Sequence, residues 1–212
     1  MSVVILFATS NPHKLAEVRA ALEPRGIETL GLEQIEGGSS IREPDEDGAT
    51  FEEIAAHKAA TYARLAGRPC LAEDSGLEVD GLGGAPGVRS ARYAGVGGTR
   101  AARDEANNRK LLDALRGVPA ERRAARFVCA MCLAHPDGRV LAATRGTFEG
   151  VIAEEPAGRN GFGYDPLLYL PAEGRTSAQL TPAEKDARSH RGAAARAMAE
   201  RIAELAARGG LA

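Results

Sequence analysis

The sequence has no surplus of charge of one sign, few cysteines and no long apolar run. Its 212 residues carry 27 Lys and Arg against 29 Asp and Glu, a formal net charge of −2. A protein that binds nucleic acid through a general basic field needs a positive excess. The apolar stretch 3–8 gives way at once to the polar stretch 11–14, which fits neither a signal peptide nor a membrane span. We therefore expect no nucleic-acid partner, no membrane association and a cytoplasmic location.

The three cysteines include one close pair, Cys129 and Cys132, at the C-x-x-C spacing of redox and zinc motifs. The pair lies within ARFVCAMCLAH, which has the composition of a strand. Side chains three residues apart on a strand point to opposite faces, so they do not easily share a metal or a disulfide. No second pair completes a zinc site. Both residues are expected to be small core or half-buried side chains.

The order of apolar segments favours an α/β fold. The runs 3–8 and 27–32 flank a segment with helical spacing, which predicts a strand, a helix and a second strand. The segments 126–134 and 140–148 lie on either side of HPDG and predict an antiparallel hairpin, so the sheet should be mixed. The 44% hydrophobic content supports a real core. No repeat or linker divides the chain, and 1–212 is expected to be one domain.

The first predicted helix begins directly after a strand, within TSNPHK. Asn11 fits the N-cap and Pro12 the first helical position. Thr9 and Ser10 precede them, and Lys14 follows one turn into the helix. A helix start gathers free N–H groups and partial positive charge, both of which favour phosphate. The spacing is not that of a P-loop, so a phosphate site and an ordinary capped helix both remain open.

The highest density of acid, base and glycine lies in residues 73–95, EDSGLEVDGLGGAPGVRSARYAG. The apolar run 69–72 predicts a buried strand that ends at Glu73 and Asp74, with a turn at the next two residues. Adjacent carboxylates at the end of a buried strand suit Mg²⁺. The glycines that follow can present N–H groups to an anion. An acidic turn before a flexible loop is the alternative interpretation.

Two further helices carry lysines. One is expected to start at Thr50 and to end at Gly67, with Lys58 on the same face as Ile54. Lys58 would then lie beside apolar surface, although a surface lysine with a buried stem is the alternative. A short helix that begins with a capping box at Thr181 carries a further lysine, Lys185. A polar helix is expected over 104–116, and a last helix begins at SHRG.

The segment GRNGFGYDP places Phe162 and Tyr164 between glycines, ahead of Asp165. Aromatic rings on a glycine-rich loop suit the gripping of a flat ligand better than the filling of a core. The alternative is an aromatic strand end.

These features together fit a nucleoside triphosphate. Four motifs in order, TSNPHK, residues 73–95, GFGYDP and SHRG, resemble the inosine triphosphate pyrophosphatase family, which removes non-standard purine nucleotides such as ITP, dITP and XTP. The resemblance implies cleavage between the α and β phosphates, giving the monophosphate and pyrophosphate, with Mg²⁺ as cofactor. It also implies an elongated mixed sheet with helices on both sides, two lobes with a central cleft, and a homodimer.

The resemblance also implies roles for residues. Asp74 would be the catalytic acid and a metal ligand, with Glu46 and Glu73 as further metal ligands. The phosphates would be held by Thr9, Ser10, Asn11, Lys14, Lys58 and Lys185. Ser75 would contact the substrate, and the base pocket would contain Phe162, Gly163, Tyr164, Asp165, His190 and Arg191. Arg191 can only donate, so it would favour the 6-keto oxygen of inosine and xanthosine over the amino group of adenosine.

Two other functions remain open. A non-catalytic nucleotide-sensing module would keep the phosphate loop and the aromatic pocket, but it would not need the acids Glu73 and Asp74. A related pyrophosphatase could act on modified pyrimidine nucleotides instead, although His190 and Arg191 favour a purine. Two departures from the family pattern are visible: Glu73 stands where bacterial relatives often have a second aspartate, and Ile54 replaces a common asparagine.

Overall fold

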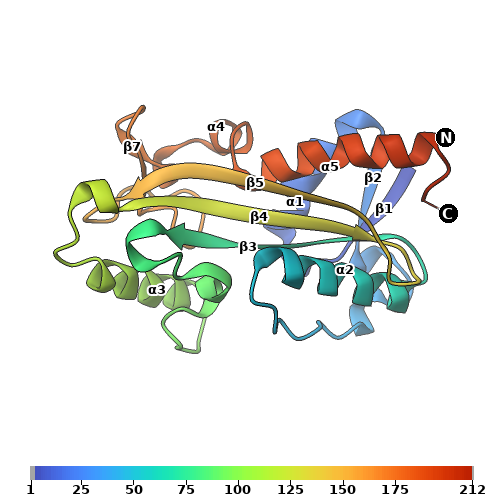
Figure 1. The fold of residues 1–212 in the computed structure, drawn as a ribbon, viewed down its shortest axis with the longest axis horizontal. Helices are drawn as coiled ribbons and strands as arrows, with labels where there is room; N and C mark the ends of the chain where they lie inside the picture. Colours follow the sequence, from blue (N-terminus) through green and yellow to red (C-terminus); the bar gives the residue numbers. More distant parts are fainter. Residues whose placement is uncertain (1–2, 212) are drawn as a thin grey trace. The chain divides into compact units, whose positions relative to one another are not determined.

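The computed structural model describes residues 3–211, with the side chain of Ser39 left out. Within them, one mixed sheet has the strand order β2-β1-β3-β4-β5-β6-β7 (Figure 1). The strands are β1 Val3–Phe7, β2 Ile27–Gly31, β3 Cys70–Val79, β4 Ala124–Ala134, β5 Val140–Ile152, β6 Leu168–Leu170 and β7 Arg175–Thr176. The α-helices are α1 Pro12–Leu22, α2 Phe51–Ala66, α3 Arg100–Ala114, α4 Pro182–Asp186 and α5 His190–Ala207. The expected α/β class with a mixed sheet is confirmed.

The described chain separates into two compact units. Unit 1 consists of residues 3–74, 129–146 and 190–211, and unit 2 consists of residues 75–128 and 147–189. The strands β3, β4 and β5 each contribute residues to both units. The assignment of the whole chain to one domain stays a prediction.

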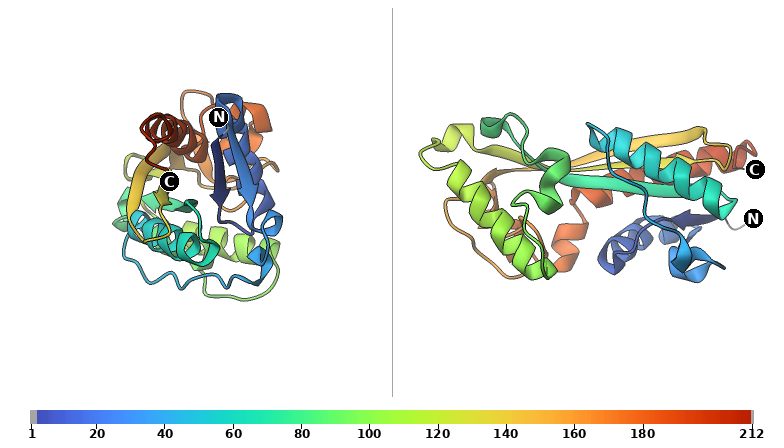
Figure 2. Two further views of the ribbon diagram at one scale, coloured as in Figure 1. Left: turned by 90° about the vertical axis from the view of Figure 1, so that its right-hand side faces the viewer. Right: turned by 90° about the horizontal axis from the view of Figure 1, so that it is seen from below.

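Unit 1 begins with the expected strand, helix and strand. β1 pairs in parallel with β2 on one side and with β3 on the other (Figure 2). Ile5, Leu6 and Phe7 are buried although their side chains point to alternate faces, whereas Val4 is 46% exposed. Burial on both faces is thus confined to the end of β1 that lies between β2 and β3. The helix α1 starts as predicted: the side chain of Asn11 accepts a hydrogen bond from the N–H of His13 at 3.0 Å, and Pro12 follows the cap.

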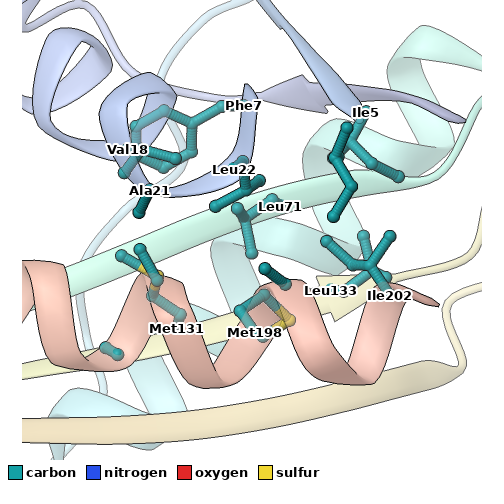
Figure 3. Packing of buried hydrophobic residues seen from close by; sticks show 14 of the residues in the cluster. Ile5, Phe7, Val18, Ala21, Leu22, Leu71, Met131, Leu133, Met198 and Ile202 are labelled. Atoms are coloured by element: carbon teal, nitrogen blue, oxygen red, sulfur yellow. The ribbon is translucent and has the colours of Figure 1, made fainter. Parts of the chain in front are cut away.

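The core of unit 1 forms where α1 and α5 pack against the sheet. Side chains from the four strands β1 to β4 and from both helices meet in one buried cluster, most of which Figure 3 shows. Its members include Ile5, Phe7, Val18, Ala21, Leu22, Leu71, Met131, Leu133, Met198 and Ile202. The helical spacing of the apolar residues in α1 and α5 therefore marks the faces that they bury.

The hairpin of β4 and β5 is confirmed. The two strands are neighbours in the sheet, and a turn at residues 135–139 joins them, with the N–H of His135 donating to the carbonyl of Arg139 at 2.9 Å. A connection this short joins only antiparallel strands. Cys129 and Cys132 are both buried on β4 as free thiols, which confirms the interpretation of the C-x-x-C as core.

Two expectations about local structure are wrong. The chain does not turn after Asp74, because β3 runs on to Val79. Leu77 and Val79 are buried in the core of unit 2, and the hydroxyl of Ser90 accepts the N–H of Leu77 at 2.8 Å, so burial extends the strand past the expected turn. The helix expected from 104 onward begins at Arg100 instead, where the side chain of Thr99 accepts the N–H of Ala102.

Among the described helices, none is long and apolar enough to cross a membrane.

The fold predicts a steric limit at Gly146 of β5. A Cβ atom there would lie 2.2 Å from the carbonyl oxygen of His190 and 2.7 Å from the amide nitrogen of Ala194, both in α5. Gly146→Ala should therefore lower the free energy of unfolding by about 1–3 kcal/mol through overpacking, measured by urea denaturation. Gly97→Ala is the matched control, because nothing lies within 4 Å of its Cβ position. Equal stability of the two variants would contradict this close approach.

Candidate functional site

The carboxylate of Glu73 on β3 is a buried charge of unit 1, 3% exposed. It accepts from Arg191 at 2.7 Å (Nε) and 3.2 Å (Nη2), and Lys14 Nζ lies 2.7 Å from its Oε1. The thiol of Cys129 donates to Oε2 at 3.0 Å. Burial by itself would raise the pKa of Glu73, but the positive charges of Arg191 and Lys14 hold that pKa well below its ordinary value. Glu73 is thus a charged, fully buried carboxylate.

Arg191 lies in the first turn of α5 and is 1% exposed. Besides Glu73, its guanidinium contacts Glu17 of α1 through Nη1 at 2.7 Å. Arg191 therefore links the strand β3 to the helix α1 inside unit 1. Arg191 and His190 belong to unit 1, whereas the expected aromatic part of the base pocket, residues 162–165, belongs to unit 2. Arg191 is held in these ion pairs, and its role in the base pocket stays a prediction.

Asp74 follows Glu73 on the strand, so its side chain points to the opposite face. It is 8% exposed, and its pKa is raised to about 7. Burial is the largest cause; Lys58 opposes it, and the negative charge of Glu46 adds to it. A carboxylate in such surroundings gains from any cation that approaches it.

Lys58 of α2 is buried near Asp74, Glu46 and Glu43. Its Nζ lies 2.8 Å from Glu46 Oε1 and 3.4 Å from Glu43 Oε1. Burial lowers the pKa of Lys58, but these carboxylates and Asp74 outweigh burial, so that its pKa is raised. The alternative of a surface lysine is wrong, because the face shared with Ile54 packs into unit 1 and only 6% of Lys58 stays exposed.

The acids near Lys58 fit a hard cation that also binds phosphate. No group of three or more His, Cys, Asp or Glu residues able to hold a metal exists among the described residues. Mg²⁺ at nucleotide sites uses one or two carboxylates and completes its shell with water and phosphate oxygens. Asp74 and Glu46 can supply two carboxylates, and a cation would relieve the repulsion between them. Glu73 already faces two cationic side chains, and its metal role stays a prediction.

The start of α1 carries the expected phosphate-binding residues. The hydroxyl of Thr9 accepts the N–H of Asn11 at 3.1 Å, and Ser10 is exposed. Lys14 is engaged by Glu73, with 22% of its side chain exposed. A phosphate at this helix start would therefore share Lys14 with Glu73, and it would compete with the Asn11 side chain for the N–H of His13.

In unit 2, the loop 161–165 is organised by Asp165, which is 1% exposed. Its Oδ2 accepts the N–H of Phe162 at 2.8 Å, and its Oδ1 accepts the hydroxyl of Ser177 at 2.7 Å. Lys185 forms an ion pair with the same carboxylate. Asp165 thus holds both the loop and one lysine of the expected site.

The two aromatic rings of this loop differ. Tyr164 is buried in the core of unit 2, and its hydroxyl donates to the carbonyl of Ser90 at 2.8 Å. Phe162 is only half-buried. The guanidinium of Arg100 lies 4.3 Å from the centroid of its ring, and Lys185 Nζ lies 5.2 Å from it. Of the two rings, Phe162 keeps more surface for a ligand.

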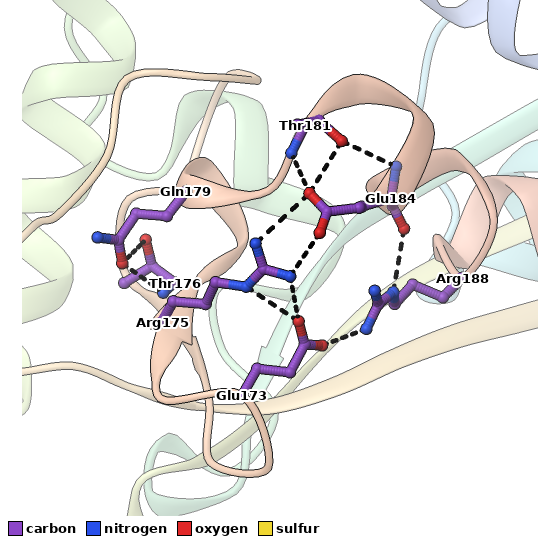
Figure 4. A network of polar contacts seen from close by, with 7 residues as sticks. All are labelled: Glu173, Arg175, Thr176, Gln179, Thr181, Glu184 and Arg188. Atoms are coloured by element: carbon purple, nitrogen blue, oxygen red, sulfur yellow. Dashed lines mark hydrogen bonds and ion pairs between the residues drawn. The ribbon is translucent and has the colours of Figure 1, made fainter.

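The helix that carries Lys185 is fixed by a polar network (Figure 4). The network consists of Glu173, Arg175, Thr176, Gln179, Thr181, Glu184 and Arg188. Thr181 and Glu184 form the predicted capping box of α4. Arg175 Nη2 lies 2.7 Å from both Glu173 Oε2 and Glu184 Oε1. A helix of five residues cannot hold itself in place, so these ion pairs determine where the backbone of Lys185 lies.

Sequence reasoning missed several residues that contact the expected site. Glu17 could have been found from the sequence, because it lies three residues after Lys14 and so shares a helix face with it. No local pattern indicates the contacts of Glu43 and Cys129, because their partners Lys58 and Glu73 are distant in the sequence.

A family model described as the Ham1 family matches residues 5–201. The dITP/XTP pyrophosphatase of Exiguobacterium sp. is 48% identical over 198 residues, 93% of this chain and 96% of the relative. The dITP/XTP pyrophosphatase of Nitratidesulfovibrio vulgaris is 50% identical over 201 residues, 92% of this chain and 94% of the relative. A solved HAM1 protein from Coxiella burnetii has a TM-score of 0.85 at 39% identity, covering 95% of this chain and 99% of the other.

The fold and these matches agree, and the chain belongs to the Ham1 family. The resemblance carried by the four sequence motifs is thereby confirmed. The roles of individual residues stay predictions.

The buried ion pairs predict a coupled loss of stability. Arg191→Met removes the main partner of Glu73 and leaves a buried charge, which should lower the free energy of unfolding by about 3–5 kcal/mol. In the double variant with Glu73→Gln, that charge is also absent. The double loss should therefore fall short of the sum of the single losses by roughly 1–3 kcal/mol, measured by urea denaturation. Additive losses would contradict a direct interaction between these two side chains.

Proposed function

We propose that this chain hydrolyses the non-standard purine nucleoside triphosphates ITP, dITP and XTP between the α and β phosphates. The products are the nucleoside monophosphate and pyrophosphate, and the reaction clears the nucleotide pool. Support comes from the family match over residues 5–201 and from the two relatives above, which are named dITP/XTP pyrophosphatases and align with nearly the whole chain.

The observation that carries the proposal is the carboxylate of Asp74. It is nearly buried in unit 1 yet lies within the electrostatic reach of Lys58, Lys14 and Glu46. A purely structural core gains nothing from such a group, whereas phosphoanhydride hydrolysis depends on positioning and on charge stabilisation around the phosphates.

Unit 1 supplies the charges for this chemistry. We assign Asp74 as the catalytic carboxylate, and Asp74 and Glu46 as the residues that would hold Mg²⁺. Glu73 could join them only by leaving its partners Arg191 and Lys14. When bound, Mg²⁺ supplies positive charge to the phosphate oxygens. Lys14 and Lys58 offset further phosphate charge, and the segment before α1, residues 9–11, offers the hydroxyls of Thr9 and Ser10 and the amide of Asn11.

Unit 2 supplies the expected aromatic contact. Phe162 would stack on the purine ring, which is indifferent to the identity of the base. Ser75, Gly163, Tyr164, Asp165 and Lys185 complete this part of the proposal. The purine 6-keto oxygen would be read by His190 and Arg191 of unit 1.

We further propose a homodimer, which the family resemblance supports, and a cytoplasmic location, which stays an expectation from the sequence. Sedimentation equilibrium of the purified chain tests the dimer: a single species of about 22 kDa, the mass of one chain, would overturn it.

A product assay tests the function. The chain is incubated with ITP, XTP, ATP, GTP and a modified pyrimidine triphosphate, with and without Mg²⁺, and pyrophosphate is separated from phosphate. We expect pyrophosphate from ITP and XTP, little from the other nucleotides, and loss of the reaction with EDTA. Binding without turnover would support a sensing module instead, and preference for the pyrimidine would support the related pyrophosphatase.

Asp74→Asn should keep the fold and lose most turnover of ITP, by about a hundredfold or more in kcat, because it removes a charge from the site while preserving shape. Steady-state kinetics at saturating Mg²⁺ measures this. Asp113→Asn is the control, since Asp113 is an exposed acid of α3 that pairs with Arg116. A near-normal rate in the Asp74 variant would remove Asp74 from the mechanism.

A further inference from the structure

We propose that one face of α3 positions the ring of Phe162, with Arg100, Asp104 and Asn108 acting as positioning residues. The inference rests on the proposed function, because it takes Phe162 as the ring on which the purine stacks. No sequence motif pointed to this face of the helix.

The three residues are four apart and so lie on one face of a helix with 3.6 residues per turn. Asp104 and Asn108 contact the same residue, Gly163, which follows Phe162 in the loop. Asp104 Oδ2 accepts the N–H of Gly163 at 3.0 Å, and Asn108 Nδ2 donates to its carbonyl at 3.0 Å. The peptide groups on both sides of Gly163 are therefore held by one helix.

Gly163 needs this support because it has φ +62°, in the left-handed region. Glycine populates that region freely, but it also has many other conformations open to it. Two hydrogen bonds to a rigid helix select one of them. The direction in which Phe162 leaves the loop is thereby fixed.

Arg100 completes the arrangement from the same face. Its guanidinium lies over the ring of Phe162, 4.3 Å from the centroid, and its Nε lies 3.9 Å from Asp104 Oδ2. A guanidinium over an aromatic face is attracted by the ring quadrupole. Asp104 thus orients both Gly163 and the cation that covers the ring.

The other end of the Asn108 amide is consistent with this arrangement. Its Oδ1 is buried and has no hydrogen-bond partner among the residues that the structure describes. A buried acceptor without a partner is unfavourable, so the orientation of Asn108 is explained by its bond to Gly163. On the inner side, Asp165 Oδ2 accepts the N–H of Phe162 at 2.8 Å. The loop is therefore held from two sides.

Kinetics on matched variants test the proposal. Asp104→Ala should lower kcat/KM for ITP about tenfold, the effect of losing a hydrogen bond to a charged group, and mainly through KM, because stacking acts in both the ground and transition states. Asp104→Asn keeps an acceptor for Gly163 and should recover most of the loss. Glu105→Ala is the control: it removes the same charge from the next position, where the side chain is 73% exposed and pairs with Arg109.

A double variant separates positioning from a general effect on the fold. In a Phe162→Ala background, Asp104→Ala should cause little further loss of kcat/KM, since the ring to be positioned is gone. A full tenfold loss in that background would overturn the proposal. An Asp104→Asn variant as impaired as Asp104→Ala, or a Glu105→Ala variant equally impaired, would also overturn it.

A fluorescence measurement needs no substrate. The chain contains no tryptophan, so Phe162→Trp introduces a single indole reporter at this position. Asp104→Ala in that background should make the introduced indole more accessible to acrylamide quenching, whereas Glu105→Ala should not. Equal quenching would contradict the positioning role. If wild-type protein released no pyrophosphate from ITP, the proposed function would fail, while this measurement would still decide whether α3 positions the ring.

Discussion

The buried charge cluster around Glu73 is the interaction on which unit 1 depends. Glu73 is a carboxylate removed from water, and such a group is tolerated only when it is fully paired. Arg191 and Lys14 provide that pairing, and they come from α5 and α1. The strand that carries Asp74 is thus tied to both helices that cover the core. A change in any of these charges alters the strand on which the proposed catalytic carboxylate lies.

Glu73 and Asp74 are neighbours on β3 but have different surroundings, because successive side chains of a strand point to opposite faces. Glu73 faces its cationic partners, and their charges keep its pKa low. Asp74 faces the acids near Lys58, and burial raises its pKa to about 7. One carboxylate is neutralised by the fold, and the other is left in surroundings that a cation would improve. This division, together with membership of the Ham1 family, supports the proposed hydrolysis of nucleoside triphosphates.

In unit 2, the loop 161–165 is held in place by hydrogen bonds. Its aromatic loop has no large apolar anchor apart from Tyr164, which packs into the core. Hydrogen bonds to Asp165 inside the loop and to one face of α3 outside it supply the order that packing does not. The ion pairs around Arg175 do the same for the short helix of Lys185. Polar contacts therefore set the geometry of the groups that we assign to the substrate.

The sequence by itself determined the α/β class, the first strand and helix, the hairpin and the starts of α1, α2 and α4, because these follow from apolar periodicity and from local hydrogen bonds such as that from the His13 N–H to Asn11. Its four motifs also determined the family. Only the tertiary structure decided that β3 continues past Asp74, that Lys58 is buried, and that Arg191 lies on Glu73. Each of these depends on contacts between residues distant in the chain, such as Glu73 with Arg191, and no local pattern records which charges the fold will bring together.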